Sequence, residues 1–519
     1  MPMTATAGPD PAHPGGAHPG RTACHALAIS AGAAYLVSIA LLATVMALGP
    51  SAAVPRMGPG GPMWSLSAAP SAATVIALER SGLLLGAIAV TIGLAAVRRG
   101  WRPSATLLIG AGSATAALFV FLPPAGSIDV LNYAIYGRIV SLGHNPYVLR
   151  PAELYRSGDP VGLFAPANWR TLPTIYGPVA TAVQWAAAAL GGTSMARIVF
   201  WIRLGNAIAF VTTAVCLVRL AGRDRASQGR VCLMWAVNPL MLFWLVGSGH
   251  VDVLLALLAV AALLMLRRRG IIAGAVTGLI VGAATAIKTP FALVAAGMAW
   301  VTRASPRTVA AGLVGAAAVL VPSFLLPGAL NTAVLSRRLT VSAGFIYPVP
   351  AVIGSKPVVF AALVLLFTLA LALLLLWRLP PGHRALPAVR PAVALAIAWL
   401  VLFPVQAPWY DALIFPLLAL MPASGLDYLL IARCLLLSEM LLPGVLPNSG
   451  SVSIAIARFS HLGLLFLLGV LAVTGVLGAW GAGKPELPDP GTDPAGSADP
   501  GPEIGAVAVP DSGQARHAR

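Results

Sequence analysis

Acidic and basic side chains that could do chemistry are few in this sequence. Only 16 of its 519 residues are Asp or Glu; six of these follow residue 481 and one is Asp10, which leaves nine for residues 26–480. Lysine is rarer still, with only Lys288, Lys356 and Lys484. Burying a charged group in an apolar chain is costly, so each of these positions requires an explanation.

Asp129 is the first candidate for a catalytic group. It directly precedes a segment whose apolar residues recur at close to helical spacing: Val130, Ala134, Ile135, Ile139 and Leu142. The spacing predicts an amphipathic helix over 129–142 that lies on a membrane surface. Asp129 then either caps this helix, which is worth about 1 kcal/mol, or acts as a general base whose pKa partial burial brings towards the working pH.

Lys288 is the first candidate for a cationic group. It ends the apolar run IIAGAVTGLIVGAATAIK, and the chain turns at Thr289-Pro290. Its ammonium either reaches out to lipid headgroups or contacts a phosphate. Arg337 and Arg338 are open to the same two interpretations, as phosphate ligands or as interfacial anchors.

Two further motifs combine polar and aromatic groups. In GHVD, His250 and Asp252 form either a weak metal-binding pair, since no third ligand is nearby, or a hydrogen-bond network at a helix end. In QAPWYD, Trp409 and Tyr410 fit an aromatic belt at a membrane boundary. They fit a sugar platform equally well, with Asp411 or Gln406 bonded to the sugar's hydroxyls.

The elements that must position these groups are membrane helices. The chain is 58% hydrophobic and 9% charged, whereas globular proteins have about 25% charged residues. Apolar runs of the length that crosses a bilayer predict about 13–15 crossings. The net charge of +17 does not indicate nucleic-acid binding, because the basic residues lie in short clusters between these runs.

The arginine clusters predict the orientation of the chain by the positive-inside rule. Those expected on the cytoplasmic side are Arg98/Arg99/Arg102, Arg219/Arg223/Arg225/Arg230, Arg267/Arg268/Arg269, Arg303/Arg307 and Arg378/Arg384/Arg390. The candidate residues then lie on the outer face. One segment is ambiguous, because 178–190 is short and either crosses the membrane or only dips into it.

Composition also predicts the domain organisation. Residues 1–25 and 481–519, rich in Pro, Gly and Ala, are expected to be disordered tails, the first of them cytoplasmic. Residues 26–480 then form one transmembrane domain that includes a long outer loop, 123–176. Loops of this length are usually functional or disordered, and the loop's many aromatic residues argue against disorder.

The order and spacing of six elements carry a family resemblance. They are DVLNYAIYGR, GHNPY, the stretch from Trp169 to Tyr176-Gly177-Pro178, GHVD, IKTPFAL and PWYDAL, and they span residues 126–413. Together they resemble the glycosyltransferase C superfamily, and within it the actinobacterial polyprenol-phosphomannose-dependent α-(1→6)-mannosyltransferases of lipomannan assembly. The fold implied is all-α and polytopic, with surface helices in a large outer loop.

The resemblance implies roles for the candidate residues. Asp129 is the expected catalytic base, and Lys288 the expected phosphate ligand, assisted by Arg138, Arg337 or Arg338. Sugar or acceptor binding is expected of Tyr133, Asn145, Tyr147, Tyr176, His250, Asp252, Trp409, Tyr410 and Asp411. The expected partners are a polyprenyl-phosphate-linked sugar donor, a mannan or glycolipid acceptor and membrane lipids, at the outer face of the plasma membrane.

No cofactor or metal is required by this chemistry, although a divalent cation remains an open alternative. The leaving phosphate is already anionic, so it needs positive charge rather than a proton donor. The alternatives to mannosyl transfer are another lipid-linked sugar, a phosphatidylinositol mannoside acceptor, a lipid-linked-sugar flippase or transporter, and a non-catalytic scaffold. The motif GHVD, in which Val251 replaces a polar residue expected of the family, leaves the acceptor open.

Overall fold

The computed structural model describes residues 19–325 and 357–443, except Ser67, Arg269, Ala304, 383–385 and 403–405, together with Phe466, Gly469, Val470 and Ala472. These residues form helices and connecting turns, and none of them lies in a strand. The all-α prediction is therefore confirmed. Most of the expected tails, 1–18 and 481–519, fall outside the described residues, whereas residues 19–25 belong to the first helix.

Five segments of the described chain are long and apolar enough to cross a membrane. They lie in α1 (Pro19–Ala47), α2 (Ala72–Arg98), α7 (Met195–Ala221), the interrupted segment Arg225–Gly247 and α13 (Pro306–Leu325). Shorter apolar helices follow the same pattern: α3 (Ala105–Val120), α10 (Asp252–Leu266), α11 (Ile271–Thr285), α12 (Phe291–Thr302), α16 (Pro357–Arg378) and α17 (Val389–Leu402). The chain is thus a polytopic membrane protein, and the count of 13–15 crossings stays a prediction.

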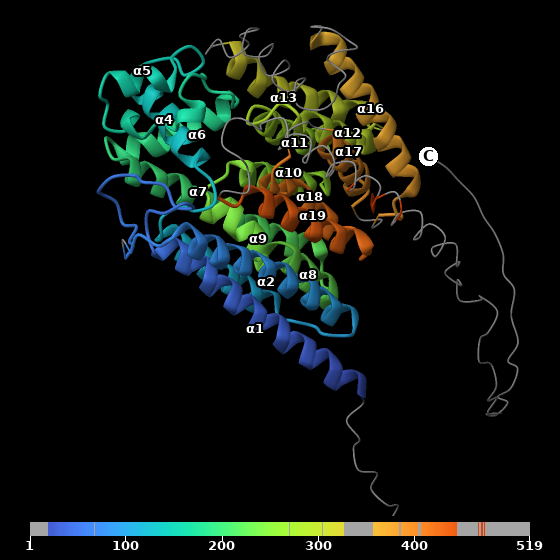
Figure 1. Ribbon diagram of the computed structural model, residues 1–519. Coiled ribbons are helices and arrows are strands. Elements are labelled where there is room, and N and C mark those ends of the chain that lie inside the picture. Colours follow the sequence, from blue (N-terminus) through green and yellow to red (C-terminus); the bar gives the residue numbers. More distant parts are fainter. Residues whose placement is uncertain are drawn as a thin grey trace, which may run out of the picture.

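Two groups of helices lie on opposite sides of a central layer (Figure 1). α1 and α2 pack along one side, and α11, α12, α13, α16 and α17 gather at the opposite side. Between them lie α10, α18 (Ile414–Ala419) and α19 (Gly425–Leu441). Of the candidate residues, Asp252 begins α10 and Lys288 follows the end of α11.

The segment Arg225–Gly247 differs from the single uninterrupted run that its composition suggested. It consists of α8 (Arg225–Val231), wider π-type turns at Cys232–Ala236 (η3) and Leu242–Gly247 (η4), and the short helix α9 (Pro239–Met241). Pro239 cannot continue a helix from the preceding turn, and the Asn238 side chain caps the next one by accepting a hydrogen bond from the Leu240 amide at 3.1 Å. The residues at this break are buried, so other parts of the protein surround them.

The long loop after α3 is ordered. It contains α4 (Asp129–Ser141), α5 (Pro151–Arg156) and two short 3-10 turns, η1 (Gly162–Phe164) and η2 (Ala167–Trp169). The helix expected at 129–142 is present, but it is not a one-sided surface helix. Nine of its 13 residues are buried, because α6 (Pro178–Gly191) and α7 pack against it.

The ambiguous segment 178–190 corresponds to α6. Its 14 residues span about 21 Å at 1.5 Å per residue, which is shorter than the ~30 Å hydrocarbon core of a bilayer. Its buried residues recur at helical spacing: Ala180, Thr181, Gln184, Ala187, Ala188 and Gly191. α6 therefore packs as a supporting helix for α4, and a full crossing or a dip at 178–190 both stay predictions.

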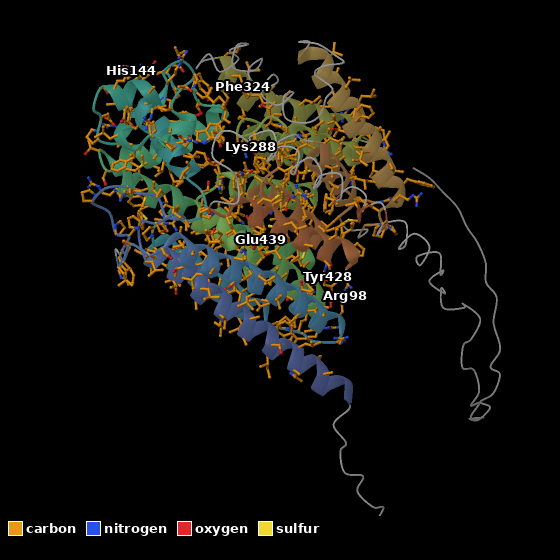
Figure 2. All side chains as sticks on the ribbon, in the orientation of Figure 1. Arg98, His144, Lys288, Phe324, Tyr428 and Glu439 are labelled. Atoms are coloured by element: carbon orange, nitrogen blue, oxygen red, sulfur yellow. The ribbon has the colours of Figure 1, made fainter. Side chains whose placement is uncertain are left out.

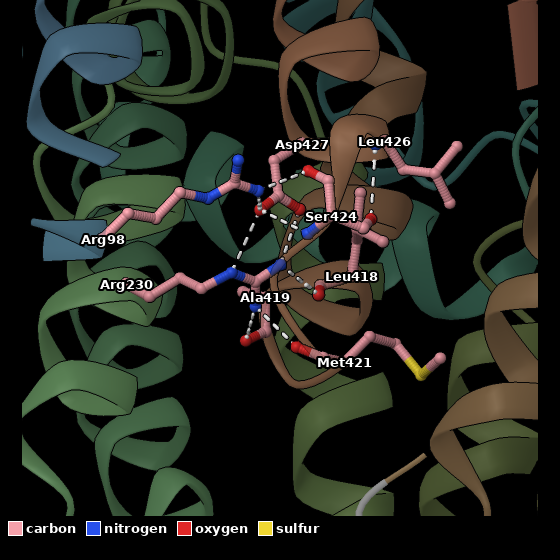
Figure 3. Close-up of polar contacts among 8 residues, drawn as sticks. All are labelled: Arg98, Arg230, Leu418, Ala419, Met421, Ser424, Leu426 and Asp427. Atoms are coloured by element: carbon pink, nitrogen blue, oxygen red, sulfur yellow. Dashed lines mark hydrogen bonds and ion pairs between the residues drawn. The ribbon is translucent and has the colours of Figure 1, made fainter. Parts of the chain in front are cut away.

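A buried ion pair joins α8 to the α18–α19 turn (Figure 3). The Arg230 guanidinium contacts both Asp427 carboxylate oxygens, at 2.6 and 3.1 Å. It also donates to the carbonyls of Leu418, Ala419 and Met421 at the end of α18. Asp427 in turn accepts the Ser424 amide at the start of α19. We call these contacts the Arg230 clamp.

Candidate active site

Asp129 is the first residue of α4, and its side chain does not cap that helix. The N-cap position is Ile128, and no side-chain hydrogen bond caps the helix there. The Asp129 amide instead donates to the Ser127 hydroxyl at 3.2 Å. The capping interpretation is therefore wrong, and the carboxylate is available for another role.

The Asp129 carboxylate lies at a boundary between protein and open space. Its side chain is 18% exposed, and its Oδ2 lies 4.0 Å from Nδ1 of His250. Burial raises the pKa of Asp129 to about 6, while the positive charge of Lys288 and a hydrogen bond from the Trp169 side chain oppose the rise and the negative charge of Asp252 adds to it. A carboxylate with a pKa near 6 is ionised at neutral pH and more basic than an ordinary aspartate.

His250 is held in a tight turn between η4 and α10. The preceding residue, Gly249, has φ of +87°, and a Cβ there would lie 2.8 Å from Val130 of α4. Only glycine fits such a backbone at so close an approach. The Asn206 amide group of α7 donates to the carbonyls of Leu245 and His250, both at 3.0 Å. The turn thus seats His250 against the start of α4.

The His250 ring is buried and fixed on several sides. It stacks on Trp409, with ring centroids 3.6 Å apart and planes 12° from parallel. Its Nδ1 is 3.4 Å from the Tyr133 hydroxyl, which accepts a hydrogen bond from the Tyr176 hydroxyl at 3.2 Å. Burial and the nearby Lys288 hold the pKa of His250 well below its usual range, so the ring is neutral at physiological pH.

Lys288 lies at the turn after α11, where Figure 2 labels it, and bonds Asp252 at the start of α10. Its Nζ is 2.7 and 2.9 Å from the two carboxylate oxygens. The ammonium also lies over the ring of Tyr410, 4.4 Å from its centroid, and 5.9 Å from that of Tyr176. Lys288 is thus directed inwards, between an acid and aromatic faces.

The Lys288 turn packs directly on the loop that carries Tyr176. The amides of Gly177 and Val179 donate to the carbonyls of Ile287 and Ala286, at 3.0 and 3.2 Å. A Cβ on Gly177 would lie 2.0 Å from the Ala286 oxygen, so the close approach requires glycine. These contacts join the long loop to the α11–α12 turn and bring Tyr176 beside Lys288.

The short 3-10 helix η5 (Pro408–Leu413) supplies Trp409 and Tyr410. Asp411 on the same turn is fully buried and forms an ion pair with Arg433 of α19. Arg433 also donates to the Gln406 side chain. Asp411 and Gln406 therefore hold η5 against α19 through Arg433, whereas Trp409 and Tyr410 face His250 and Lys288.

Eight of the predicted residues converge from separate parts of the chain. They are Asp129, Tyr133, Tyr176, His250, Asp252, Lys288, Trp409 and Tyr410. We call these eight residues, with Trp169, the Asp129–Lys288 cluster. Asp252 and Lys288 also line a small pocket whose other walls are mainly apolar: Leu255, Pro290, Phe291, Trp399, Tyr410 and Leu413.

Other predicted residues lie elsewhere. Arg138, nine residues after Asp129 on α4, bonds Asp159 at 2.8 and 3.0 Å. Nine helical residues separate the two by about 13 Å, so Arg138 does not reach the cluster. Burial would raise the pKa of Asp159, but the bonds from Arg138 and from the amides of Gly162 and Val161 outweigh it and lower that pKa.

Asn145 and Tyr147 belong to the support of the long loop. The Asn145 side chain accepts the Tyr147 amide at 2.9 Å, and the Tyr147 hydroxyl bonds that of Thr181 on α6 at 3.1 Å. Arg337 and Arg338 lie outside the described residues.

Two contributors were not singled out as site residues. Trp169 bonds the Asp129 carboxylate, although its sequence position, 40 residues on, gave no sign of this contact. Arg203 of α7 is fully buried and donates to the carbonyls of Phe119, Leu122 and Val246. It joins the end of α3 to η4, directly before the His250 turn. An arginine within an apolar helix is the one sequence signal that could have indicated it.

The arrangement offers one basic carboxylate and one confined cation. Asp129 can accept a proton from a group that approaches its exposed side. Lys288 can offer charge to an anion, provided that the anion shares or replaces Asp252 as its partner. The neutral His250 and the aromatic rings around it complete a site suited to an uncharged hydroxylated group beside an anionic one.

Comparison with known proteins gives a consistent family match. A family model described as alpha-(1→6)-mannopyranosyltransferase, N-terminal domain, matches residues 29–304, just over half of the chain. This range contains Asp129, His250, Asp252 and Lys288. No solved structure matches.

Three curated relatives are similar over parts of the chain. Alpha-(1→6)-mannopyranosyltransferase B of Corynebacterium glutamicum is 27% identical over 28% of this chain and 24% of its own length. An alpha-(1→6)-mannopyranosyltransferase of Mycobacterium tuberculosis is 29% identical over 26% and 22%. Alpha-(1→6)-mannopyranosyltransferase A of C. glutamicum is 26% identical over 33% and 35%. The matched segments thus span between about a fifth and a third of each relative.

Proposed function

This chain belongs to the alpha-(1→6)-mannopyranosyltransferase family, and we propose that it transfers mannose from polyprenyl-phosphomannose to an α-(1→6)-mannan acceptor of the lipomannan type. The observation that carries the mechanism is the convergence of Asp129 and Lys288 in one cluster. The names of the curated relatives support the sugar and the linkage. The active site is proposed to face the outer side of the plasma membrane.

The proposed reaction is a single displacement with inversion. An acceptor hydroxyl oxygen attacks the anomeric carbon of a β-linked mannosyl phosphate, and the bond from that carbon to the phosphate oxygen breaks. The bonding electrons leave with the phosphate, and the acceptor's proton passes to Asp129. One base is sufficient because the leaving phosphate needs no proton, unlike the leaving group in glycoside hydrolysis, where two carboxylates act.

Lys288 is proposed to stabilise the departing phosphate. Its ammonium is close enough to Asp129 to influence the pKa of that carboxylate, and it is held over Tyr410. In the structure its partner is Asp252, at 2.7 Å. Donor binding would then place the phosphate beside Lys288, where a fixed positive charge favours the charge that develops on the leaving group.

The mainly apolar pocket beside Lys288 supports a lipid-linked donor. It lies between α10, α12, α17 and η5, and several of the neighbouring helices are apolar enough to be immersed in a bilayer. A prenyl chain that lies against these apolar helices would stay in an apolar environment while its phosphate meets Lys288. No cofactor is required in this scheme, since the reaction transfers a sugar that is already activated.

The experiment that tests this proposal is transfer of labelled mannose to a short α-(1→6)-mannoside in membranes that contain the protein. Three donors are compared: polyprenyl-phosphomannose, a nucleotide-linked mannose and a polyprenyl-phosphate pentose. We expect product from the first donor alone, and none with Asp129→Asn at matched expression. Product from the pentose donor instead would reassign the sugar. Donor movement across the membrane that Asp129→Asn leaves intact, without product, would indicate a transporter.

A further inference from the structure

The histidine beside Asp129 has one ring nitrogen bonded and one without a partner. His250 Nδ1 lies 3.4 Å from the Tyr133 hydroxyl and 4.0 Å from Asp129 Oδ2. Its Nε2 is buried and has no hydrogen-bond partner in the described part of the chain. A neutral imidazole carries its proton on only one of these nitrogens, so the neighbours of Nδ1 decide which tautomer is present.

The order of the tyrosine hydroxyls gives a direction to the hydrogen-bond chain. The Tyr176 hydroxyl donates to the Tyr133 oxygen at 3.2 Å. The proton of Tyr133 is then free to be donated, and Nδ1 of His250 is the acceptor within reach. A phenol that donates to Nδ1 requires this nitrogen to be unprotonated, which places the proton of the imidazole on Nε2.

We infer that Tyr176 and Tyr133 fix His250 in the Nε2-protonated tautomer, so that an unprotonated nitrogen faces Asp129. The three side chains are positioning residues, because none of them transfers the proton in the proposed reaction. The inference rests on the proposed function for its kinetic consequence, but the tautomer itself can be observed without any activity.

The His250 tautomer determines whether the Asp129 carboxylate faces a hydrogen-bond donor. With Nδ1 unprotonated, the ring offers no donor to the carboxylate oxygen 4.0 Å away, so it does not stabilise the ionised form of Asp129 and the carboxylate stays basic. With Nδ1 protonated, the ring would donate to that oxygen, stabilise the carboxylate and make it a weaker base. Two phenol hydroxyls therefore control the proton affinity of the carboxylate at a distance.

The other groups around Asp129 act in both tautomers. Lys288 from the α11–α12 turn and the Trp169 side chain lower the pKa of Asp129, and Asp252 of α10 raises it. The further members of the hydrogen-bond chain, Tyr133 and Tyr176, are neutral phenols whose pKa burial raises well above the usual range. Changing a tyrosine to phenylalanine thus alters the His250 tautomer without adding or removing a charge.

The test combines Tyr133→Phe with a matched control on the same helix, Tyr136→Phe. The Tyr136 hydroxyl is also buried, but it donates to the Leu172 carbonyl at 3.2 Å. The protein is labelled with ¹⁵N-histidine, and His250→Gln identifies the His250 signals among those of the eight histidines. We expect the Nε2-protonated tautomer in the wild type and in Tyr136→Phe, and a shift towards the Nδ1-protonated form in Tyr133→Phe.

The kinetic readout is the pH dependence of mannosyl transfer. In Tyr133→Phe we expect the acid limb of the profile to move down by about one pH unit, since a new donor to the carboxylate lowers its pKa, and the rate at pH 7 to fall about tenfold. Tyr136→Phe should leave the limb in place. A wild-type His250 that is Nδ1-protonated or charged at pH 7 would overturn the inference, as would an unmoved limb in Tyr133→Phe. Absence of wild-type transfer together with the expected tautomers would count against the proposed function alone.

Discussion

The Arg230 clamp and the Asp129–Lys288 cluster both place charged side chains inside an apolar protein, but they differ in how fully these groups are bonded. Arg230 contacts both oxygens of Asp427 and three backbone carbonyls. In the Asp129–Lys288 cluster, His250 Nε2 has no partner in the described part of the chain, and the Asp129 side chain is 18% exposed. In the described part of the chain, the charged groups of the Arg230 clamp bond one another and the backbone. The Asp129–Lys288 cluster keeps polar atoms that a ligand could bond.

This difference separates a structural role from a chemical one. A buried ion pair whose donors and acceptors are satisfied fixes the elements that supply it. A buried polar atom without a partner costs stability, and in the cluster the one on His250 lies beside a partly exposed carboxylate that a ligand can approach. Figure 2 shows the two regions well apart, with Lys288 in one and Arg98 and Tyr428 beside the other.

The largest difference between the two regions is expected from Lys288→Ala. Loss of the charge proposed to meet the departing phosphate should lower the rate of mannosyl transfer about 10²- to 10³-fold, the cost of removing one such electrostatic contact. The unfolding temperature in detergent should also fall, because Asp252 stays buried without its bonded partner, so the rate is compared per folded molecule. A variant that unfolds much earlier but keeps its rate per folded molecule would place Lys288 with the clamp.

Arg230→Ala should show the opposite pattern. It leaves Asp427 buried, with Arg98 at 3.9 Å as its remaining charged neighbour in the described part of the chain, so we expect a loss of about 3 kcal/mol in the free energy of unfolding. Mannosyl transfer per folded molecule should stay near that of the wild type. The double variant Arg230→Met with Asp427→Leu removes both charges and should be more stable than the single one, which a thermal melt of the three proteins would show.

The pH dependence of transfer tests the state of Asp129 in the cluster. The group must be ionised to accept a proton, and its pKa is raised to about 6. Activity should therefore be near its plateau at pH 7.5 and fall about tenfold for each pH unit well below 6. An acid limb near pH 4, the value of an unperturbed aspartate, would contradict the environment described for this carboxylate.

Trp169→Phe should give the smallest effect. Removing the hydrogen bond that favours the ionised carboxylate raises the pKa of Asp129, so the acid limb should move to higher pH, by less than about one unit. The rate at pH 7 should change by less than about threefold, because the smaller ionised fraction is offset by the stronger base. The direction is opposite to that expected of Tyr133→Phe, so a comparison of the two profiles distinguishes the contacts. A limb that moves down in Trp169→Phe would show that Trp169 does not donate to Asp129.

Much of the fold could be predicted because membrane helices depend on composition and length. The apolar runs beginning near Ala26, Val75, Ser104 and Ile198 correspond to α1, α2, α3 and α7. The break at Asn238-Pro239 carried a sequence signal, since Asn-Pro favours a turn, but the hydropathy of the surrounding run does not register it. The one-sided character expected of α4 was wrong for a related reason: spacing identifies a helix, but not the helices that cover its other faces.

The candidate site was predictable as a set of rare polar residues, but not as a set of contacts. Scarcity singled out Asp129, His250, Asp252 and Lys288, and these lie together. Scarcity also singled out Asp411, which pairs with Arg433, and the resemblance implied a role for Arg138, which pairs with Asp159. Pairing depends on which helix faces are opposed, and a single sequence does not contain that information.

The chemical role of the Asp129–Lys288 cluster is tested most directly by two acid-to-amide changes, Asp129→Asn in the cluster and Asp427→Asn in the clamp. Both proteins are purified alongside the wild type, and each is measured for thermal unfolding and for mannosyl transfer per folded molecule. Asp129→Asn should keep the unfolding temperature and lose at least about 10²-fold in rate, while Asp427→Asn should lose stability and keep its rate. Equal losses of rate in the two variants, or a fully active Asp129→Asn, would contradict the assignment of chemistry to the Asp129–Lys288 cluster.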